Sequence, residues 1–400
     1  KVVVWNRKNK LLNEQTLIKG KCKDRIFQSQ SLCLSVLDTN LLCEKQCAEK
    51  TECVAKIRCA TNLLYEKQCA EKRRSMIIPT LRVAEREVYE EMLPAWKQHG
   101  VKCMRVNMTR YGMERYVEDV RYIREQMGEG FGVMADLPIP GRKYRLLFEG
   151  IMEVKKGERL VFIPEKAEER ADAVRVEIPE FSENAEKTRI IIGDGELSLQ
   201  PEEITRFQIT AIAEYNQLIR GRKSFALLGV FPYALYEEEV LEEYLKALEQ
   251  ISPCQVVLSF SEDLQILSVL KEKIEERIPG VRVVPKLETQ KGIDACEDMF
   301  QIFPEVMLGR GDLGLYSELT EFGRNQEKVL GLARRYSKNA IVATDILTSL
   351  YEKEIPSRGE LTDLYYLEKE GVRDVVVSAG IAVQTEIFSR FCELAGAFQE

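Results

Sequence analysis

From Met76 onward, the sequence alternates between short apolar runs and amphipathic segments with helical spacing. Eight runs have the length and composition of buried strands: MIIPTL, VKCMRVNMT, FGVMADLP, QVVLSF, VRVVPKLE, EVMLGRGD, NAIVATDI and DVVVSAG. Segments between them, such as VYEEMLPAWKQHG and YVEDVRYIREQMG, are amphipathic and end at glycine, as helices do. Eight strand-and-helix units in succession predict an α/β protein with a closed (β/α)8 TIM barrel; a doubly wound open sheet is the second possibility.

The alternation is interrupted between about residues 142 and 223. Here the pattern changes to short alternating runs, KYRLLFEG, ERLVFI and RIIIGDGELSLQ, with glycine-containing turns between them. This pattern of short alternating runs and turns predicts a small β-domain. The expected organisation is therefore a barrel formed by residues 76–141 and 224–400, with a β lid domain of residues 142–223 inserted after the third barrel strand.

Charged residues follow two of the predicted barrel strands. Lys286 and Glu288 stand at the end of VRVVPKLE, and Asp312 stands at the end of EVMLGRGD. Because the carboxyl ends of parallel strands meet at one face of a barrel, these side chains are expected to converge. Charges at strand ends often only solvate a loop, but two carboxylates and an ammonium group around one opening suit a divalent cation and an anionic substrate.

Composition excludes several functional classes. The net charge is −7 and no long basic run occurs, so neither nucleic acid nor an anionic membrane surface is an expected partner. No apolar stretch reaches the length of a membrane span, and the barrel is expected to be cytoplasmic. The only histidine, His99, excludes a Ser-His-Asp triad and a multi-histidine metal site, and is expected to be a loop residue.

Residues 1–75 differ from the rest of the chain. They contain seven of the eleven cysteines and a near-exact repeat, TNLLCEKQCAEK followed by TNLLYEKQCAEK. Packing constrains only buried positions, so the identity indicates duplicated DNA. A cysteine-ligated metal module or a disulfide scaffold is the alternative, although no CxxC spacing is present. We expect a disordered or spurious extension, with Met76 as the natural start.

Several of these segments together resemble the pyruvate kinase family. KLETQKG and GRGDLG match its K-x-E-x-x-x-G and A-R-G-D-L-G motifs, MRVNMTRYG matches R-x-N-F-S-H-G, and VATDIL matches I-C-A-T-Q-M-L. IIIGDGELSL resembles a segment of the family's lid domain. KSFALLGVFPYAL places Lys223 at a family lysine, and PSRGE places Arg358 at the arginine of P-T-R-A-E. The resemblance extends from Met76 to about Gly380.

The resemblance implies roles for residues that would contact the substrate phosphoenolpyruvate. Arg105 would grip the phosphoryl group, and Lys286 would neutralise charge on the bridging and enolate oxygens. Backbone N–H groups around Gly311 and Asp312 would hold the substrate carboxylate. Thr344 would lie near the carbon atom that is protonated.

The resemblance also implies two ion sites. Glu288 and Asp312 would bind a divalent ion, Mg²⁺ or Mn²⁺. Asn107, Thr109 and Asp136 would bind a monovalent cation, K⁺, if that site is kept. The family's second substrate, ADP or ATP, would bind beside these ions.

Departures from the family pattern affect mainly the nucleotide-facing and monovalent-cation motifs. The T-x-G-P-x-S motif is replaced by PTLRVAE, and D-T-K-G-P-E-I-R is replaced by DLPIPGRKYR. The nucleotide-side histidine is Arg110, the basic residues of S-F-I-R-K-A are replaced by Ser261 and Glu262 or Asp263, and S-G-E-T-A-x-G reads SAGIAVQ. With the sequence ending at Glu400, the family's C-terminal domain is expected to be lacking, and an oligomer is possible.

Three functions follow from this pattern. The first is a phosphotransferase that converts phosphoenolpyruvate and ADP to pyruvate and ATP through a metal-stabilised enolate. The second is a metal-dependent lyase or aldolase that forms an enolate of a pyruvate-like substrate without a nucleotide. The third is a non-catalytic paralogue that binds a ligand or partner.

Overall fold

The chain divides into two units, Lys1–Lys72 and Arg73–Glu400. The computed structural model describes residues 4–5, 11–12, 76–109, 112–128, 130–138, 144–178, 180–181, 189–193, 195–228 and 236–397. In the first unit, β1 (Val4–Trp5) pairs antiparallel with β2 (Leu11–Leu12). The cysteine-containing repeat and the predicted extension otherwise lie outside the described residues.

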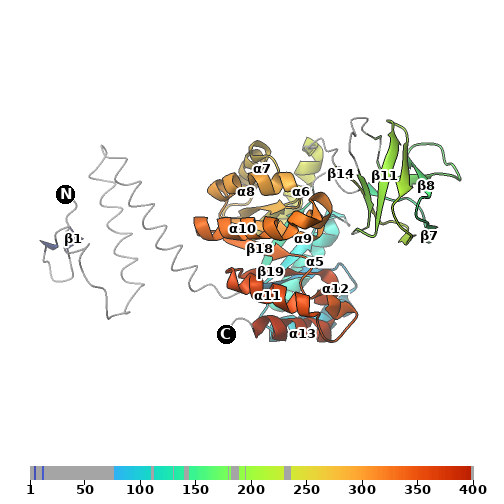
Figure 1. Ribbon diagram of the computed structural model, residues 1–400. Coiled ribbons are helices and arrows are strands. Elements are labelled where there is room, and N and C mark those ends of the chain that lie inside the picture. The colour runs from blue at the N-terminus through green and yellow to red at the C-terminus, as the bar shows by residue number, and fades with distance from the viewer. Residues whose placement is uncertain are drawn as a thin grey trace, which may run out of the picture. The chain divides into compact units, whose positions relative to one another are not determined.

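Eight parallel strands of the second unit form a closed barrel (Figure 1). Their order is β15 (Gln255–Leu258), β16 (Arg282–Leu287), β17 (Glu305–Gly309), β18 (Asn339–Ala343), β19 (Asp374–Val377), β3 (Met76–Leu81), β4 (Cys103–Asn107) and β5 (Gly132–Leu137). The barrel closes because β5 pairs with β15. The predicted (β/α)8 barrel is confirmed, and the open sheet is wrong.

The strands alternate between two apolar environments. Buried side chains from all eight strands fill the barrel interior: Ile78, Cys103, Met134, Val257, Val284, Met307, Ile341, Ala343 and Val376. Neighbouring residues such as Val133 and Val256 pack instead in the layer between strands and helices. This alternation follows from the two-residue period of a strand, and it explains why the runs read as continuously apolar.

Helices cover the outside of the barrel (Figure 1). They are α4 (Arg86–Gln98), α5 (Met113–Met127), α6 (Glu238–Ile251), α7 (Leu264–Arg277), α8 (Gln290–Ile302), α9 (Arg310–Tyr316), α10 (Phe322–Tyr336), α11 (Arg358–Lys369), α12 (Ala379–Ala382) and α13 (Thr385–Gly396), with 3-10 turns η1 (Leu319–Glu321) and η2 (Thr348–Tyr351). Local sequence sets several starts: Asp263 caps α7, Thr289 caps α8, and Ser357 and Glu360 form a capping box on α11. In the described part of the chain, none of the helices combines the length and the apolar character that crossing a membrane requires.

Described residues between Tyr144 and Leu228 contribute strands to two sheets apart from the barrel. Seven strands lie in one sheet, in the order β6 (Tyr144–Arg145), β14 (Ser224–Leu228), β10 (Arg189–Ile192), β11 (Leu197–Ile204), β12 (Ile209–Ala213), β8 (Arg159–Pro164) and β9 (Val174–Val176). A second pair joins β13 (Gln217–Arg220) to β7 (Ile151–Val154). These strands enclose a separate apolar core that includes Phe162 and Phe225.

The structure corrects two boundaries. The lid was predicted to end at residue 223, but Phe225 to Leu228 pair with β10, so the lid sheet extends through β14. The strand ending in GRGD was predicted to carry Asp312, but β17 ends at Gly309 and Asp312 lies in the first turn of α9. The predicted boundaries follow the ends of apolar runs in the sequence. The observed strand ends are set by backbone hydrogen bonds to the neighbouring strand, and the two can differ by a few residues.

Candidate active site

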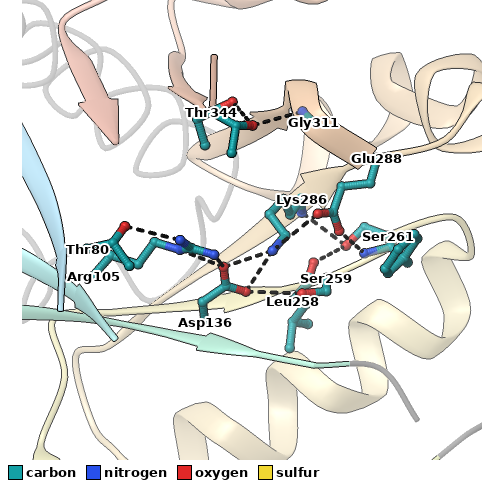
Figure 2. A network of polar contacts seen from close by, with 12 residues as sticks. Thr80, Arg105, Asp136, Leu258, Ser259, Ser261, Lys286, Glu288, Gly311 and Thr344 are labelled. Atoms are coloured by element: carbon teal, nitrogen blue, oxygen red, sulfur yellow. Dashed lines mark hydrogen bonds and ion pairs between the residues drawn. The ribbon is translucent and has the colours of Figure 1, made fainter. Parts of the chain in front are cut away.

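The centre of the candidate site is the buried carboxylate of Asp136, at the carboxyl end of β5 (Figure 2). Lys286 Nζ lies 2.9 Å from one of its oxygens and 2.8 Å from the other. The Arg105 guanidinium contacts it at 2.8 Å through Nε and 2.6 Å through its terminal nitrogen. Ser259 donates a hydrogen bond to Asp136 at 3.1 Å, and Arg105 also donates to Thr80 at 3.1 Å. Strands β3, β4, β5 and β16, together with the end of β15, thus meet in one polar network.

Lys286 joins this network to a second carboxylate. Its ammonium group lies 3.3 Å from Glu288 Oε1, and Glu288 Oε2 accepts a hydrogen bond from the Phe260 N–H at 2.9 Å. Glu288 is 4 % exposed, and it packs against Gly309, where a Cβ atom would lie 2.7 Å from Glu288 Cγ. Glycine at the end of β17 therefore makes room for this carboxylate.

The charges explain the protonation state of Asp136. Burial by itself would raise its pKa, but the positive charges of Lys286 and Arg105 and their hydrogen bonds outweigh burial and lower the pKa below its ordinary value. Asp136 is therefore ionised at neutral pH. The two cations, buried Lys286 and half-buried Arg105, balance the two buried carboxylates of this network, as charges removed from water require.

A strained loop follows β18 beside this network. Thr344, Asp345 and Leu347 have φ angles of 68°, 54° and 50°, in the left-handed region that non-glycine residues rarely adopt. The Thr344 hydroxyl accepts a hydrogen bond from the Gly311 N–H at 2.8 Å (Figure 2). The loop after β18 is thereby tied to the first turn of α9.

Arg310 holds this strained loop in place. Its buried guanidinium donates to the carbonyl oxygens of Thr344, at 3.0 Å, and of Asp345. It also contacts Gln326 at 3.3 Å and Asp363 at 2.6 Å. Arg310 therefore orients Thr344 without itself being part of the predicted set of site residues.

Replacing Asp363 by alanine tests this role. The change removes the carboxylate partner of a buried guanidinium, so we expect a loss of about 1–3 kcal/mol in the free energy of unfolding. Chemical denaturation measures it. Glu275→Ala, which removes an exposed i,i+4 partner of Lys271, is the matched control and should change stability by no more than about 0.5 kcal/mol. An equal effect of both variants would contradict the role of the Arg310 contacts.

The two carboxylates predicted to hold a divalent ion stand at neighbouring strand ends. Glu288 directly follows β16, and Asp312, which is partly exposed, lies three residues after Gly309, the residue that contacts Glu288. Within the residues that the structure describes, three or more His, Cys, Asp or Glu side chains do not gather into a metal cluster. Mg²⁺ commonly uses one or two carboxylates together with substrate oxygens and water, so a divalent-ion site at Glu288 and Asp312 stays a prediction.

The other predicted site residues lie outside the network or make contacts different from those predicted. Asn107 pairs in register with Asp136 on the adjacent strand, and Thr109 is exposed beyond the end of β4. Because Asp136 already forms ion pairs with two side chains, its participation in a monovalent-cation site stays a prediction. In the lid, Lys223 forms an ion pair with Glu196 at 2.5 Å, and Arg358 is exposed at the start of α11.

Four residues of the site were missed by sequence reasoning. Thr80 and Ser259 contact the charged side chains, Ser261 accepts a hydrogen bond from the Lys286 N–H at 3.2 Å, and Arg310 positions Thr344. The signal for the serines was present, since SFS directly follows an apolar run in the same way as the charged residues do. Arg310 lies in the same GRGD segment as Asp312, which was predicted to be a site residue, whereas Arg310 was not.

A closed (β/α)8 barrel that gathers charged side chains at the carboxyl ends of its strands has the architecture of the barrel enzymes. The family model described as the pyruvate kinase barrel domain matches residues 72–384, and the chain belongs to the pyruvate kinase family.

Curated relatives agree with this membership. The chain is 25 % identical over 321 residues to a pyruvate kinase of Thermotoga maritima, covering 78 % of this chain and 67 % of that protein. It is 26 % identical over 320 residues to a pyruvate kinase of Mycobacterium tuberculosis, covering 78 % and 66 %. A pyruvate kinase of Pyrobaculum aerophilum is 26 % identical over 264 residues, covering 64 % and 56 %. The chain thus spans about two thirds of the length of the first two relatives.

Proposed function

We propose that the protein is a pyruvate kinase-like phosphotransferase of glycolysis, which converts phosphoenolpyruvate and ADP to pyruvate and ATP. The observation that carries this proposal is the buried network of Lys286, Arg105, Asp136 and Glu288 at the carboxyl ends of the strands. It places two fixed cations beside a carboxylate that suits a divalent ion, in a chain of the pyruvate kinase family.

The residues of the network match what phosphoryl transfer needs. Such transfer depends on positioning and on positive charge fixed before the reaction begins, more than on covalent chemistry by the protein. Arg105 would hold the phosphoryl oxygens, and Lys286 would neutralise the oxygen that keeps the electron pair as the phosphorus–oxygen bond breaks. Asp136 holds both cations at their positions, so that little reorganisation is needed when the substrate enters.

A divalent ion bound by Glu288 and Asp312 would act as a Lewis acid toward the substrate oxygens. The chain's own groups would supply the remaining contacts. The N–H groups of Gly311 and Asp312 would bind the substrate carboxylate, with the Gly311 N–H released from Thr344 Oγ1. The Thr344 hydroxyl, which donates to the Ala343 carbonyl, would then lie near the carbon atom that accepts a proton.

One observation favours a second candidate function, enolate chemistry without a nucleotide. Glu262 stands where the family motif has a basic residue, and it is buried at 9 % exposure. It accepts a hydrogen bond from Thr289 at 2.6 Å and lies 3.8 Å from Lys291. A carboxylate at a position where the family has a basic residue removes a positive charge that would attract the phosphates of a nucleotide. This change favours a lyase or aldolase that uses no nucleotide.

Formation of pyruvate and ATP from phosphoenolpyruvate by the full chain tests the proposal. The assay contains Mg²⁺, with and without ADP and with and without K⁺. Equal amounts of the two products, dependent on ADP, are the expected result. Turnover of pyruvate-like substrates that is indifferent to ADP would replace the proposal by the second candidate.

Asp312→Asn tests the divalent-ion site. Removing one of two carboxylates should weaken Mn²⁺ binding at least about tenfold and lower turnover with it, because hard cations bind through charged oxygens. A Mn²⁺ titration followed by electron paramagnetic resonance measures the affinity. Asp294→Asn, an exposed aspartate on α8, is the control. Unchanged Mn²⁺ affinity in the Asp312 variant would show that the ion binds elsewhere.

A further inference from the structure

Two cysteines meet at the end of the barrel strands opposite to the active site. Cys103 is the first residue of β4, and Cys254 directly precedes β15. Both strands pair with β5, so the two cysteines lie on either side of it. Their sulfur atoms are 4.0 Å apart, although the residues are 151 positions apart in the chain.

Gly132 at the start of β5 leaves the space in which the two sulfurs meet. It pairs in register with Cys103, and the Cys254 N–H donates to the carbonyl of the next residue, Val133, at 2.9 Å. A Cβ atom on Gly132 would lie 3.2 Å from the Cys254 sulfur and 3.3 Å from the Cys103 sulfur. The backbone therefore brings both thiols to one gap that a larger residue would crowd.

The two thiols are unequal in exposure and in acidity. Cys103 is 4 % exposed, whereas Cys254 is open to solvent. The hydrogen bond between the two sulfurs and the charge of Arg282 lower the pKa of Cys254 to about 6, against the opposing effect of burial. The same hydrogen bond, burial and the charge of Asp374 raise the pKa of Cys103, while Arg124 also interacts with both thiols. Cys254 is thus the more acidic and the more accessible of the two thiols.

The other two described cysteines provide the contrast. Cys296 and Cys392 are buried, and burial raises their pKa to about 11 and about 12. Thiols of that kind react slowly, because the thiolate is the nucleophile.

We propose that Cys103 and Cys254 form a reversible dithiol–disulfide site that is oxidised by small-molecule disulfides. The Cys254 thiolate attacks one sulfur of the disulfide RSSR, forming the mixed disulfide Cys254–S–S–R and releasing RS⁻. The Cys103 sulfur then attacks the Cys254 sulfur, forms the Cys103–Cys254 bond and releases a second RS⁻. Cys254 gives its proton to water before the attack and Cys103 gives up its proton as it attacks, and the two released RS⁻ groups take up two protons to become two RSH molecules. The protein dithiol is thereby oxidised and RSSR is reduced.

The step requires the sulfurs to approach from 4.0 Å to about 2.05 Å. Because β4 and β15 lie on either side of β5, the backbone must also move, since the Cα atoms of a disulfide lie within about 7 Å of each other. Cys103 begins its strand and Cys254 ends a loop, so the movement involves the ends of strands and not their interiors. The bond would close a loop of about 150 residues, so the oxidised form should melt at least about 5 °C above the reduced form.

Peptide mapping of the full chain tests the proposal. The reduced protein is treated with glutathione disulfide, quenched by alkylation and digested with trypsin, which releases Cys103–Arg105 and Ala247–Lys271, each with a single cysteine. The expected product is these two peptides joined by a disulfide, reversed by dithiothreitol, together with the rise in melting temperature. Cys103→Ser should leave Cys254 as a stable glutathione adduct without that rise, and Cys254→Ser should leave Cys103 unmodified.

Three results would overturn it. The first is a glutathione adduct that persists on Cys254 in the wild-type chain. The second is a disulfide between Cys254 and a cysteine of residues 1–75. The third is no reaction at either thiol under conditions in which glutathione disulfide oxidises dithiothreitol. Neither the expected result nor these depends on catalytic activity.

Discussion

Replacing Lys286 by methionine is expected to reduce pyruvate formation from phosphoenolpyruvate at least about a hundredfold, the usual effect of removing one fixed charge-stabilising group. The methionine keeps the length of the side chain but removes the ammonium group that lies between Asp136 and Glu288. Asp136 keeps Arg105 and Ser259, and Glu288 keeps the Phe260 N–H, so the fold should persist. Steady-state kinetics at saturating Mg²⁺ and circular dichroism measure the two effects.

Lys271→Met is the matched control for this variant. Lys271 lies on α7 and pairs with Glu275 on the same helix, so its loss should leave turnover unchanged. Turnover of the Lys286 variant within about threefold of wild type would remove Lys286 from the chemistry, since a charge-stabilising group contributes far more than that.

Replacing Asp136 by asparagine is expected to lower the free energy of unfolding by about 3–5 kcal/mol, because it leaves the buried Lys286 and the half-buried Arg105 without their shared carboxylate. The Lys286 side chain is 7 % exposed and that of Arg105 14 % exposed, so water replaces only a small part of the lost interaction. Chemical denaturation measures the effect. Asp172→Asn, which alters an exposed ion pair with Arg170 in the lid, should change stability little.

The pH dependence and a double variant make this prediction sharper. Since the pKa of Asp136 is lowered in the folded protein, its contribution is complete above the ordinary pKa of aspartate, about 4, and is lost as the pH falls through the lowered value. The difference between wild type and Asp136→Asn should therefore shrink below about pH 4. Combining Asp136→Asn with Lys286→Met should cost less than the sum of the single changes. Strict additivity would contradict the shared network.

Much of the barrel could be predicted because its signal is local. Each strand is buried on both faces, so it reads as an apolar run, and β3 has the predicted bounds, Met76–Leu81. The lid was less predictable. Its strands are short and paired antiparallel, and the position of β14 depends on its pairing with β10, which lies more than thirty residues earlier and leaves no periodicity at residue 223.

The site divides in the same way. Lys286 and Glu288 stand two residues apart at one strand end, and the sequence pattern alone places them together. Asp136 was assigned to an ion site, whereas its partners come from β4, which pairs with β5, and from β16, which the barrel closure brings near through β15. The Cys103–Cys254 pair likewise depends on closure around β5. Contacts between residues so far apart in the sequence cannot be predicted from local residue spacing; they become visible only in the tertiary structure.

We expect the network around Lys286 to bind the enolate-forming substrate together with a divalent ion. The melting temperature of the full chain with Mg²⁺ and oxalate, a planar mimic of the enolate, tests this in wild type and in Lys286→Met. A ligand at about a hundred times its Kd stabilises the folded state by about 2.7 kcal/mol, which raises the melting temperature by several degrees. We predict this rise in wild type and its loss in the variant; an equal rise in both, or none in wild type, would contradict the account.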